Sequence, residues 1–373
     1  MRRERGSAGA RERRSARYCL ALLRSRAPAL LRSVFLLFSF SLAIGCSSSD
    51  APASRVVVYC AHDREFAEEI LEDFTRQTGL KVLARYDTEA NKAVGLYEDL
   101  VRESARPRCD VHWNNEILAT IRLQEQGILQ PYQSPAGKPF PEAFKAADHS
   151  WHAFAARARI LLINTKLVSA KDQPTSLRDL TGAAWKGRVA MAKPQFGTTA
   201  SEAACLFQAW GQEKARALYK DLHANSVHLV AGNKQVAVGV GQGQFAAGLT
   251  DTDDAMAEVE AGNPVALVYP DAAADKNSKF GTLFLPNTVA VIRGCPNLEG
   301  AKKLVDFLLS PEVEAKLAQG PSRQIPLNPN VKATLPIEIR TPNMVRVLPV
   351  DYSKAAKLWP KVQDFLTKEF ARK

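Results

Sequence analysis

The chain has 373 residues and a formal net charge of +11, with 50 lysines and arginines against 39 aspartates and glutamates. Ten arginines and two glutamates fall within residues 1–33, so this segment carries eight of those charges and leaves +3 for the rest. A basic charge confined to one end is poor evidence for nucleic acid binding, which needs a basic surface on the folded part. We therefore expect no nucleic acid partner.

An uncharged apolar segment, residues 34–46, follows the arginines and ends in Leu42-Ala43-Ile44-Gly45-Cys46. Its length suits the core of a secretory signal peptide and falls short of the roughly 20 residues that a membrane-spanning helix needs. The ending resembles the lipobox of bacterial lipoproteins, whose cysteine is lipidated after cleavage. This resemblance implies a signal peptide over 1–46, a lipid anchor on Cys46, and a protein tethered at the periplasmic or extracellular face of a membrane.

From residue 55 onward, short β-branched runs alternate with longer amphipathic stretches. Strands are predicted over 56–59, 81–86 and 110–113. Helices are predicted from Phe66 to a C-terminus near Gly79, over 91–104, and over 117–126. This β-α-β-α-β order is typical of a parallel sheet with helices on both faces.

A similar alternation resumes after residue 187 and continues to residue 318. Strands are predicted over 188–191, 227–230, 245–249, 265–269 and 288–292. Helices are predicted over 199–210 and 214–225, from about 234, and over 254–261, 300–309 and 311–318. The pattern indicates an α/β protein of two lobes with a cleft between them.

Loops that follow strands are the candidate ligand sites, because open α/β sheets bind ligands at the carboxyl ends of their strands. The loop after the first strand contains His62 and Asp63 just before a predicted helix. Either residue could cap that helix or contact a ligand. The next such loop contains Asn115 and Glu116, which offer an amide and a carboxylate to a ligand. Alternatively, Glu116 stabilises the helix that follows.

Two more loops of this kind precede helices in the second half of the chain. Gly197, Thr198 and Thr199 suit a bound anion, although Thr199 and Glu202 have the spacing of a capping box, which would occupy some of the free N–H groups. The run from Asp251 through Thr252 and Asp253 to Asp254 is the densest carboxylate cluster of the sequence. Asp251 and Asp253 are expected to face the cleft and to coordinate a hard cation or accept hydrogen bonds from a solute, whereas Asp254 is expected to stabilise the start of a helix.

Catalytic motifs are missing from the sequence. It contains neither a G-x-S-x-G nucleophile elbow nor an H-E-x-x-H zinc motif, so we expect a binding protein and not an enzyme. Arg157 and Arg159 flank a predicted crossover strand, where they either pair with nearby carboxylates or contact an anion.

Several stretches, in this order along residues 55–331, resemble the ferric-iron-binding, transferrin-like branch of bacterial ABC-transporter solute-binding proteins. They are Val58-Tyr59, Trp113-Asn114-Asn115-Glu116, Ala156-Arg157-Ala158-Arg159, Trp185-Lys186-Gly187-Arg188-Val189, Gly197 to Ser201, and Ile325-Pro326-Leu327-Asn328-Pro329. The resemblance implies the class II fold of periplasmic binding proteins, in which two α/β lobes joined by crossing strands close over one ligand. After a linker at 47–54, lobe 1 would comprise 55–156 and 283–325, and lobe 2 would comprise 157–282 and 326–373. The implied partners are a permease and its ATPase, and the implied state is a monomer without a resident cofactor.

Position by position, the resemblance assigns a carboxylate ligand to Glu116, places His62 or Asp63 near the family's histidine, and puts a synergistic anion at Gly197 to Ser201. Thr252 and Asp253 stand where that branch has its paired tyrosines, and the sequence contains no tyrosine pair.

Two hypotheses about the ligand follow from this departure. In the first, Glu116, Asp251 and Asp253 bind Fe(III) or another hard cation, together with His62 or Asp63 and an accompanying anion. In the second, the same cleft holds a phosphorylated or phosphonate solute, such as a sugar phosphate or an aminoalkylphosphonate, with its phosphoryl group at the Gly197 to Ser201 loop.

Overall fold

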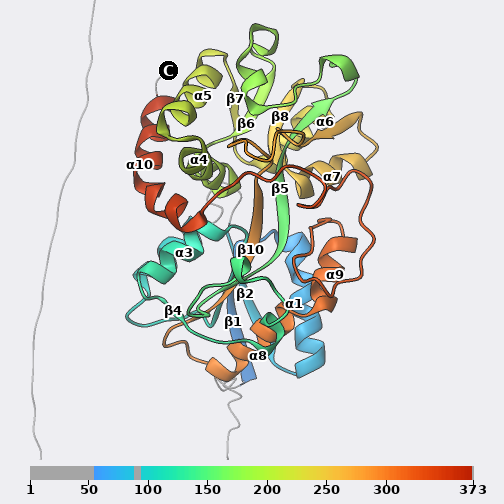
Figure 1. Cartoon of the computed structure of the whole chain (residues 1–373). Helices are drawn as coiled ribbons and strands as arrows, with labels where there is room; N and C mark the ends of the chain where they lie inside the picture. Colours follow the sequence, from blue (N-terminus) through green and yellow to red (C-terminus); the bar gives the residue numbers. More distant parts are fainter. Residues whose placement is uncertain (1–53, 88–93, 372–373) are drawn as a thin grey trace, which may run out of the picture. The chain divides into compact units, whose positions relative to one another are not determined.

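A computed structural model describes residues 54–87 and 94–371 (Figure 1). The predicted signal peptide with Cys46, the linker up to residue 53, and the first residues of the helix predicted over 91–104 lie outside the described residues. None of the helices within the described residues combines the length and the apolar character that crossing a bilayer requires.

The first part of the chain forms the predicted parallel β-α-β-α-β unit. Its elements are β1 (Arg55–Cys60), α1 (Arg64–Thr78), β2 (Lys81–Tyr86), α2 (Gly95–Arg102), β3 (Val111–Asn114) and α3 (Ile117–Glu125). Strand β1 pairs in parallel with both β2 and β3. Helix α1 buries the apolar side that contains Ile70 and Phe74, and it ends at Gly79, whose φ of 73° is left-handed and suits a residue without a Cβ. The strands and helices of this unit are therefore confirmed.

One long strand connects this unit to the second part of the chain. Strand β5 (His152–Asn164) is buried over its whole length. Its first half pairs antiparallel with β10 (Phe284–Ile292), and its second half pairs antiparallel with β8 (Ala247–Asp251) and β9 (Val265–Val268). Because β10 also pairs with β3, β5 joins two half-sheets. We call β2, β1, β3 and β10 the first half-sheet and β8, β6 and β7 the second. The first half of the protein is the first half-sheet with α1 to α3, and the second half is the second half-sheet with the helices of residues 197–260.

The second half-sheet has β6 (Val189–Ala192) between β7 (His228–Val230) and β8, all parallel. Its helices are α4 (Gly197–Trp210), α5 (Gln212–Ala224), α6 (Asn233–Gly241) and α7 (Thr252–Glu260). The remaining short elements are β4 (Leu129–Gln130), which pairs with β10, and 3-10 turns at Pro135–Gly137, Glu142–Phe144, Ala170–Asp172, Leu177–Thr181 and Ala183–Trp185. The arrangement is an α/β fold of two halves that share a long strand, as predicted. Which residues belong to which lobe stays a prediction.

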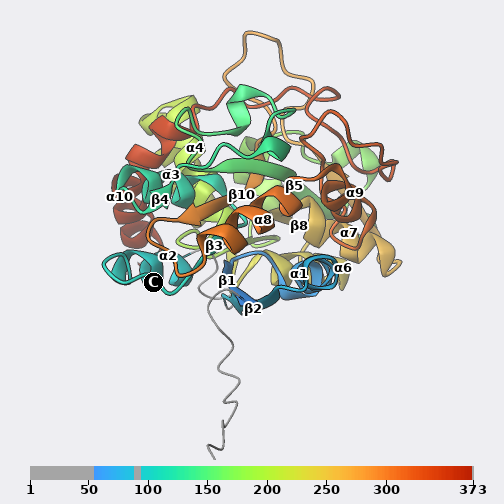
Figure 2. The same ribbon diagram turned by 90° about the horizontal axis from the view of Figure 1, so that it is seen from below.

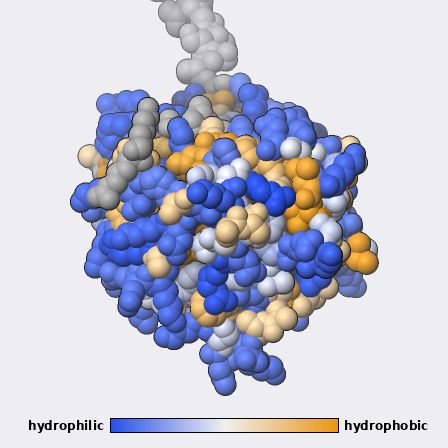
Figure 3. All heavy atoms as spheres, turned by 90° about the horizontal axis from the view of Figure 1, so that it is seen from above, coloured by the Kyte–Doolittle hydropathy of each residue, from blue (hydrophilic) through white to orange (hydrophobic). Residues whose placement is uncertain are grey.

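The chain closes with α8 (Leu298–Leu308), α9 (Pro311–Gln319) and α10 (Tyr352–Phe370). Helix α10, which the sequence analysis did not predict, packs against α3 of the first half and α4 of the second (Figure 1). Figure 2 shows the first half-sheet from below, with α1 beside β1 and β2. The starts of α1 and α6, which belong to different halves, are linked by an ion pair of 3.0 Å between Glu65 and Lys234. The face seen from above is largely hydrophilic, with apolar residues in small groups (Figure 3), which is ordinary for a folded surface.

Candidate functional site

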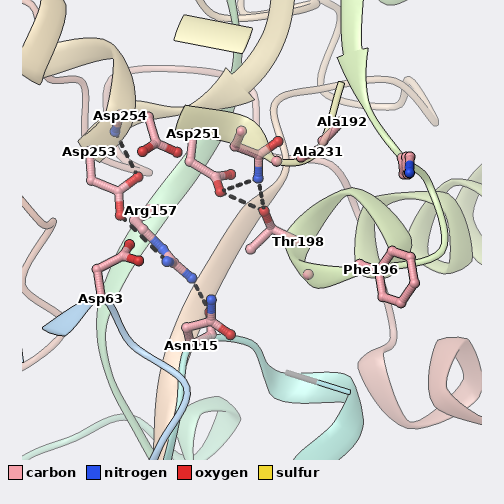
Figure 4. A pocket seen from close by; sticks show the side chains of 14 residues that line it. Asp63, Asn115, Arg157, Ala192, Phe196, Thr198, Ala231, Asp251, Asp253 and Asp254 are labelled. Atoms are coloured by element: carbon pink, nitrogen blue, oxygen red, sulfur yellow. Dashed lines mark hydrogen bonds and ion pairs between the residues drawn. The ribbon is translucent and has the colours of Figure 1, made fainter. Parts of the chain in front are cut away.

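A pocket lies where strand ends and helix starts of the two halves meet, as expected for an α/β sheet. Asp63 comes from the start of α1, Asn115 from the loop before α3, and Arg157 from β5 (Figure 4). The second half contributes the other lining residues: Ala192, Lys193, Phe196, Gly197, Thr198, Ala231, Gly232, Asn233, Asp251, Asp253 and Asp254. The structure thus brings together six of the residues predicted for ligand binding.

The pocket is small and carries more acids than bases. Its cavity volume is about 20 Å³, which is room for one or two water molecules or an ion. Four aspartates line it against two basic side chains, those of Arg157 and Lys193. In this arrangement the pocket favours a small guest with positive charge over an anion alone.

Asp251 is the best-connected acid of the site. Its Oδ1 accepts a hydrogen bond of 3.0 Å from Arg159, and its Oδ2 accepts hydrogen bonds from the Thr198 hydroxyl and, at 3.0 Å, from the Asn233 amide. Burial raises the pKa of this carboxyl, but Arg159, Arg157 and the Thr198 hydroxyl outweigh that effect and hold it below its usual value. Asp251 is therefore ionised and held in one orientation, and it joins the middle of β5 and the end of β8 to the starts of α4 and α6.

Thr199 and Glu202 do not form the capping box that their spacing allows. Helix α4 begins at Gly197, with Phe196 at its N-cap position, and within the described residues no side chain caps that start. Glu202 turns inward and accepts a hydrogen bond of 3.0 Å from Arg159, because this buried guanidinium needs carboxylate partners. The Thr199 hydroxyl donates to Asn233 at 3.0 Å. Thr199 is buried and does not line the pocket.

Asp253 and Asp254 lie close to Asp251 and form an acidic cluster with it. Oxygen atoms of Asp251, Asp253 and Asp254 all lie within 4.8 Å of one another, so one hard cation could reach all three. Asp253 also pairs with Arg157 across 3.4 Å, and both side chains are buried. Asp254 lies in the first turn of α7, as predicted, and its side chain lines the pocket as well.

Arg157 connects the two halves at the base of the pocket. It donates to the backbone carbonyl of Asn115 in the first half and to the Asp253 carboxylate in the second (Figure 4). The Asn115 side chain is 2% exposed, and its Oδ1 accepts no hydrogen bond from any described residue. A buried acceptor without a donor costs about 1–3 kcal/mol, so this oxygen is suited to a ligand that supplies a donor or a cation.

Besides Thr199, three more predicted ligand residues lie away from this pocket. His62 is buried against Phe66 and Trp113, with its Nε2 2.8 Å from the Gln324 amide nitrogen. The Thr252 hydroxyl accepts a hydrogen bond of 3.2 Å from the Ala158 amide.

Glu116, the third, caps α3. Its carboxylate accepts the amides of Leu118 and Ala119 at 2.7 and 2.8 Å and the Ser201 hydroxyl at 2.6 Å. The structure therefore does not bring Glu116 together with Asp251 and Asp253 in one set of ligands, because helix capping, the alternative considered for this residue, holds its carboxylate elsewhere.

Asn233 and Lys193 line the pocket but were not predicted. Asn233 is the first residue of α6 and follows the end of β7, so the rule that identified the other loops could have found it. Lys193 directly follows β6 and has the same signal. The loop between β7 and α6 contains no carboxylate or cluster of hydroxyls, so its composition does not mark it as a polar loop.

Known proteins share this fold. A model of the bacterial extracellular solute-binding protein family matches residues 119–354. Iron uptake protein A1 of Synechocystis is 28% identical over 284 residues, which cover 73% of this chain and 76% of that protein.

Two solved structures are similar in fold. Iron-bound HitA of Pseudomonas aeruginosa has a TM-score of 0.73 at 21% identity, covering 84% of this chain and 99% of that one. The periplasmic binding protein AfuA of Actinobacillus pleuropneumoniae, with fructose-6-phosphate bound, has a TM-score of 0.75 at 23% identity, covering 86% and 99%. Since the family model spans more than half of the chain, this protein belongs to the bacterial extracellular solute-binding protein family.

Proposed function

We propose that this protein is the solute-binding lipoprotein of an ABC importer and that it captures ferric iron, or another hard cation, together with an anion. The signal peptide over 1–46 would export it, lipid on Cys46 would anchor it, and a permease with its ATPase would receive the solute. Membership of the solute-binding family supports the general role, and the relative named iron uptake protein A1 supports the choice of iron.

The observation that carries the choice of cation is the group formed by Asp251, Asp253 and Asp254, whose oxygen atoms lie within 4.8 Å of one another in a pocket of about 20 Å³. Hard cations prefer oxygen ligands, and the pocket has room for an ion. Asn115 Oδ1, which accepts no bond from the described residues, is a further oxygen of the right kind. A tyrosine-free ligand set of this type would replace the family's paired tyrosines.

The two halves explain how binding and release can work without chemistry on the solute. Asp63 and Asn115 belong to the first half of the pocket, and the three clustered aspartates belong to the second. A cation between them is attracted to both halves and so favours the closed arrangement, whereas separation of the halves would remove part of its ligands. This agrees with a carrier that is not an enzyme.

A second candidate ligand is a phosphonate or phosphorylated solute, and a different group of atoms favours it. Helix α4 starts in the pocket without a side-chain cap from the described residues, and Lys193 and Arg157 line the same space. Exposed N–H groups of a helix start and basic side chains suit a phosphoryl group. The amine of an aminoalkylphosphonate would then face the aspartates. At this cavity volume, a sugar phosphate requires the halves to separate.

A thermal-shift panel tests the proposal and separates the two ligands. The probes are ferric citrate, ferric iron with carbonate, a sugar phosphate and 2-aminoethylphosphonate, each with the intact chain. A ligand at 100 times its dissociation constant adds about 2.7 kcal/mol of stability, which is a shift of a few degrees. We expect a shift with iron that is lost in Asp253→Asn and kept in Asp275→Asn, an exposed acid outside the pocket. A shift with the phosphonate and none with iron would eliminate the iron proposal.

A further inference from the structure

Glu116 and Ser201 join the two halves of the protein at a buried point beside the pocket. Glu116 precedes α3 in the first half, and Ser201 lies in α4 of the second. The Ser201 hydroxyl donates to Glu116 Oε2 at 2.6 Å, with the two residues 1% and 0% exposed. A short hydrogen bond to a buried carboxylate is among the stronger kinds.

The remaining bonds of the Glu116 carboxylate stay within the first half. Its oxygen atoms accept the Leu118 and Ala119 amides at the start of α3, and the Asn114 amide approaches Oε1 at 3.4 Å. Among the hydrogen bonds that this carboxylate forms with described residues, the bond from Ser201 is thus the one that reaches the second half. Separating the halves would break it without disturbing the cap of α3.

Helix α4 links this contact to the pocket. Its first two residues, Gly197 and Thr198, line the pocket, and Ser201 follows one turn later. A rigid helix transmits a shift at one turn to the next, so movement of its start toward a bound solute also moves Ser201 toward Glu116. Further along the same helix, burial and the nearby Glu116 charge raise the pKa of the Cys205 thiol, which places this side of α4 against Glu116.

Helix α10 packs across the two helices that carry the contact. It packs against both α3 and α4, and Trp359 and Gln363 of α10 line a second pocket that also contains Glu116 and Gly197. The Arg122 guanidinium of α3 lies 4.9 Å from the centre of the Trp359 ring. In the present arrangement Glu116 is 1% exposed, so an opening motion would expose its carboxylate.

We propose that Ser201 and Glu116 are positioning residues that favour closure of the cleft without contacting the solute. Glu116 thus contributes to affinity as a closing contact across the two halves and not as a ligand to the guest. The proposal rests on the two-lobed fold and on the proposed role as a solute-binding protein, but it does not depend on which solute is bound.

The test measures closure in the protein without added ligand, so it remains valid if the iron proposal fails. Spin labels on Glu72→Cys of α1 and Ala257→Cys of α7, both exposed and in different halves, report the distance across the cleft. Cys295 is replaced by serine in all samples, since the other cysteines in the described part are buried. Ser201→Ala is the test variant, and Ser322→Ala is its control, because Ser322 is a buried serine that bonds to the Leu317 carbonyl five residues away.

We expect a short-distance population in the unaltered protein and in Ser322→Ala. In Ser201→Ala, the ratio of closed to open molecules should fall about tenfold, as the loss of a hydrogen bond to a charged group predicts. Glu116→Gln should lower the ratio as well, and adding Ser201→Ala to it should lower it little further, because the two residues act through one bond. Equal label-distance distributions in Ser201→Ala and in Ser322→Ala would overturn the proposal, as would the absence of a short-distance population in the unaltered protein.

Discussion

The Arg159 guanidinium and the Asp251 carboxylate form a fully buried ion pair, with 3.0 Å between Nη1 and Oδ1. They are also cross-strand partners in the pairing of β5 with β8. Glu202 accepts the second arm of the same guanidinium at 3.0 Å. A buried charge network of this kind is weak evidence for stability as a whole, but removing one member leaves charges uncompensated in a medium of low polarity. Arg159 therefore fixes the orientation of Asp251, which lines the pocket.

Replacing Arg159 should destabilise the fold strongly. Arg159→Met leaves the Asp251 and Glu202 carboxylates buried without their partner, which should lower the free energy of unfolding by about 3–5 kcal/mol. Urea denaturation followed by circular dichroism measures this loss. Arg178→Met is the matched control, because Arg178 is half-exposed in its 3.2 Å pair with Asp271 and such pairs contribute about 0–1 kcal/mol. Similar losses in both variants would show that burial of the Arg159 network has no special weight.

Asp254 should affect binding more than stability. Asp254→Asn removes one carboxylate from the group that would coordinate a cation, while the half-buried side chain keeps its shape and can still serve the first turn of α7. We expect the affinity for ferric citrate to fall at least about tenfold, with a change in unfolding free energy within about 0.5 kcal/mol. Isothermal titration and urea denaturation give the two numbers. Unchanged affinity would remove Asp254 from the site.

Acidification should destabilise the protein through a buried histidine. Burial lowers the pKa of His112 to about 4, while its Nδ1 lies 3.0 Å from the Tyr59 carbonyl. In the unfolded chain a histidine has a pKa of about 6.5, so between about pH 6.5 and 4 the unfolded state binds more protons and stability falls as the pH falls. The loss should reach about 3 kcal/mol at the lower end. Burial lowers the pKa of His152 to about 4 as well and acts in the same direction.

His112→Asn tests this account, because asparagine can donate to the same carbonyl but does not titrate. Urea denaturation at pH 7 and at pH 4.5 should show a smaller loss of stability for the variant than for the unaltered protein. If both lose the same amount, His112 does not carry the pH dependence.

The exposed ion pair between Lys234 of α6 and Glu65 of α1 should favour closure weakly. The pair spans the two halves at 3.0 Å, and each side chain is 52% exposed. Lys234→Glu should reduce the closed population about twofold at low salt, and Lys234→Glu combined with Glu65→Lys should restore it, as a surface pair of up to about 1 kcal/mol predicts. The label distances across the cleft provide the readout. A double variant that resembles the single one would mean that the charges do not attract each other there.

Sequence patterns identified several residues that line the candidate pocket, because the loops that carry them are defined locally. Each predicted loop follows a strand and precedes a helix, and parallel strands bring those loops to one edge of the sheet. Asp63, Asn115 and Asp253 were found in this way. The directions of the side chains were harder to predict from the sequence, because they depend on hydrogen-bond partners that are distant in the sequence. Glu116 turns to Ser201, 85 residues away, and His62 turns to Gln324, 262 residues away.

The fold was predictable for the same reason, except where packing overrides local signals. Helix α10 contains Pro360 in its interior, and a proline there usually argues against a helix. Packing of buried Ala355, Val362 and Leu366 against the rest of the protein stabilises it regardless. The full length of β5 was also unexpected, since a strand buried on both faces shows no alternation of apolar and polar residues.

The central claim is that the carboxylates of Asp251, Asp253 and Asp254 hold a hard cation, and elemental analysis tests it most directly. The intact protein and Asp253→Asn would be purified side by side without chelators from cells supplied with iron. The account predicts near-stoichiometric iron in the unaltered protein and little in the variant. Iron at background level in both proteins, with a phosphonate or phosphate ester bound instead of iron, would contradict it.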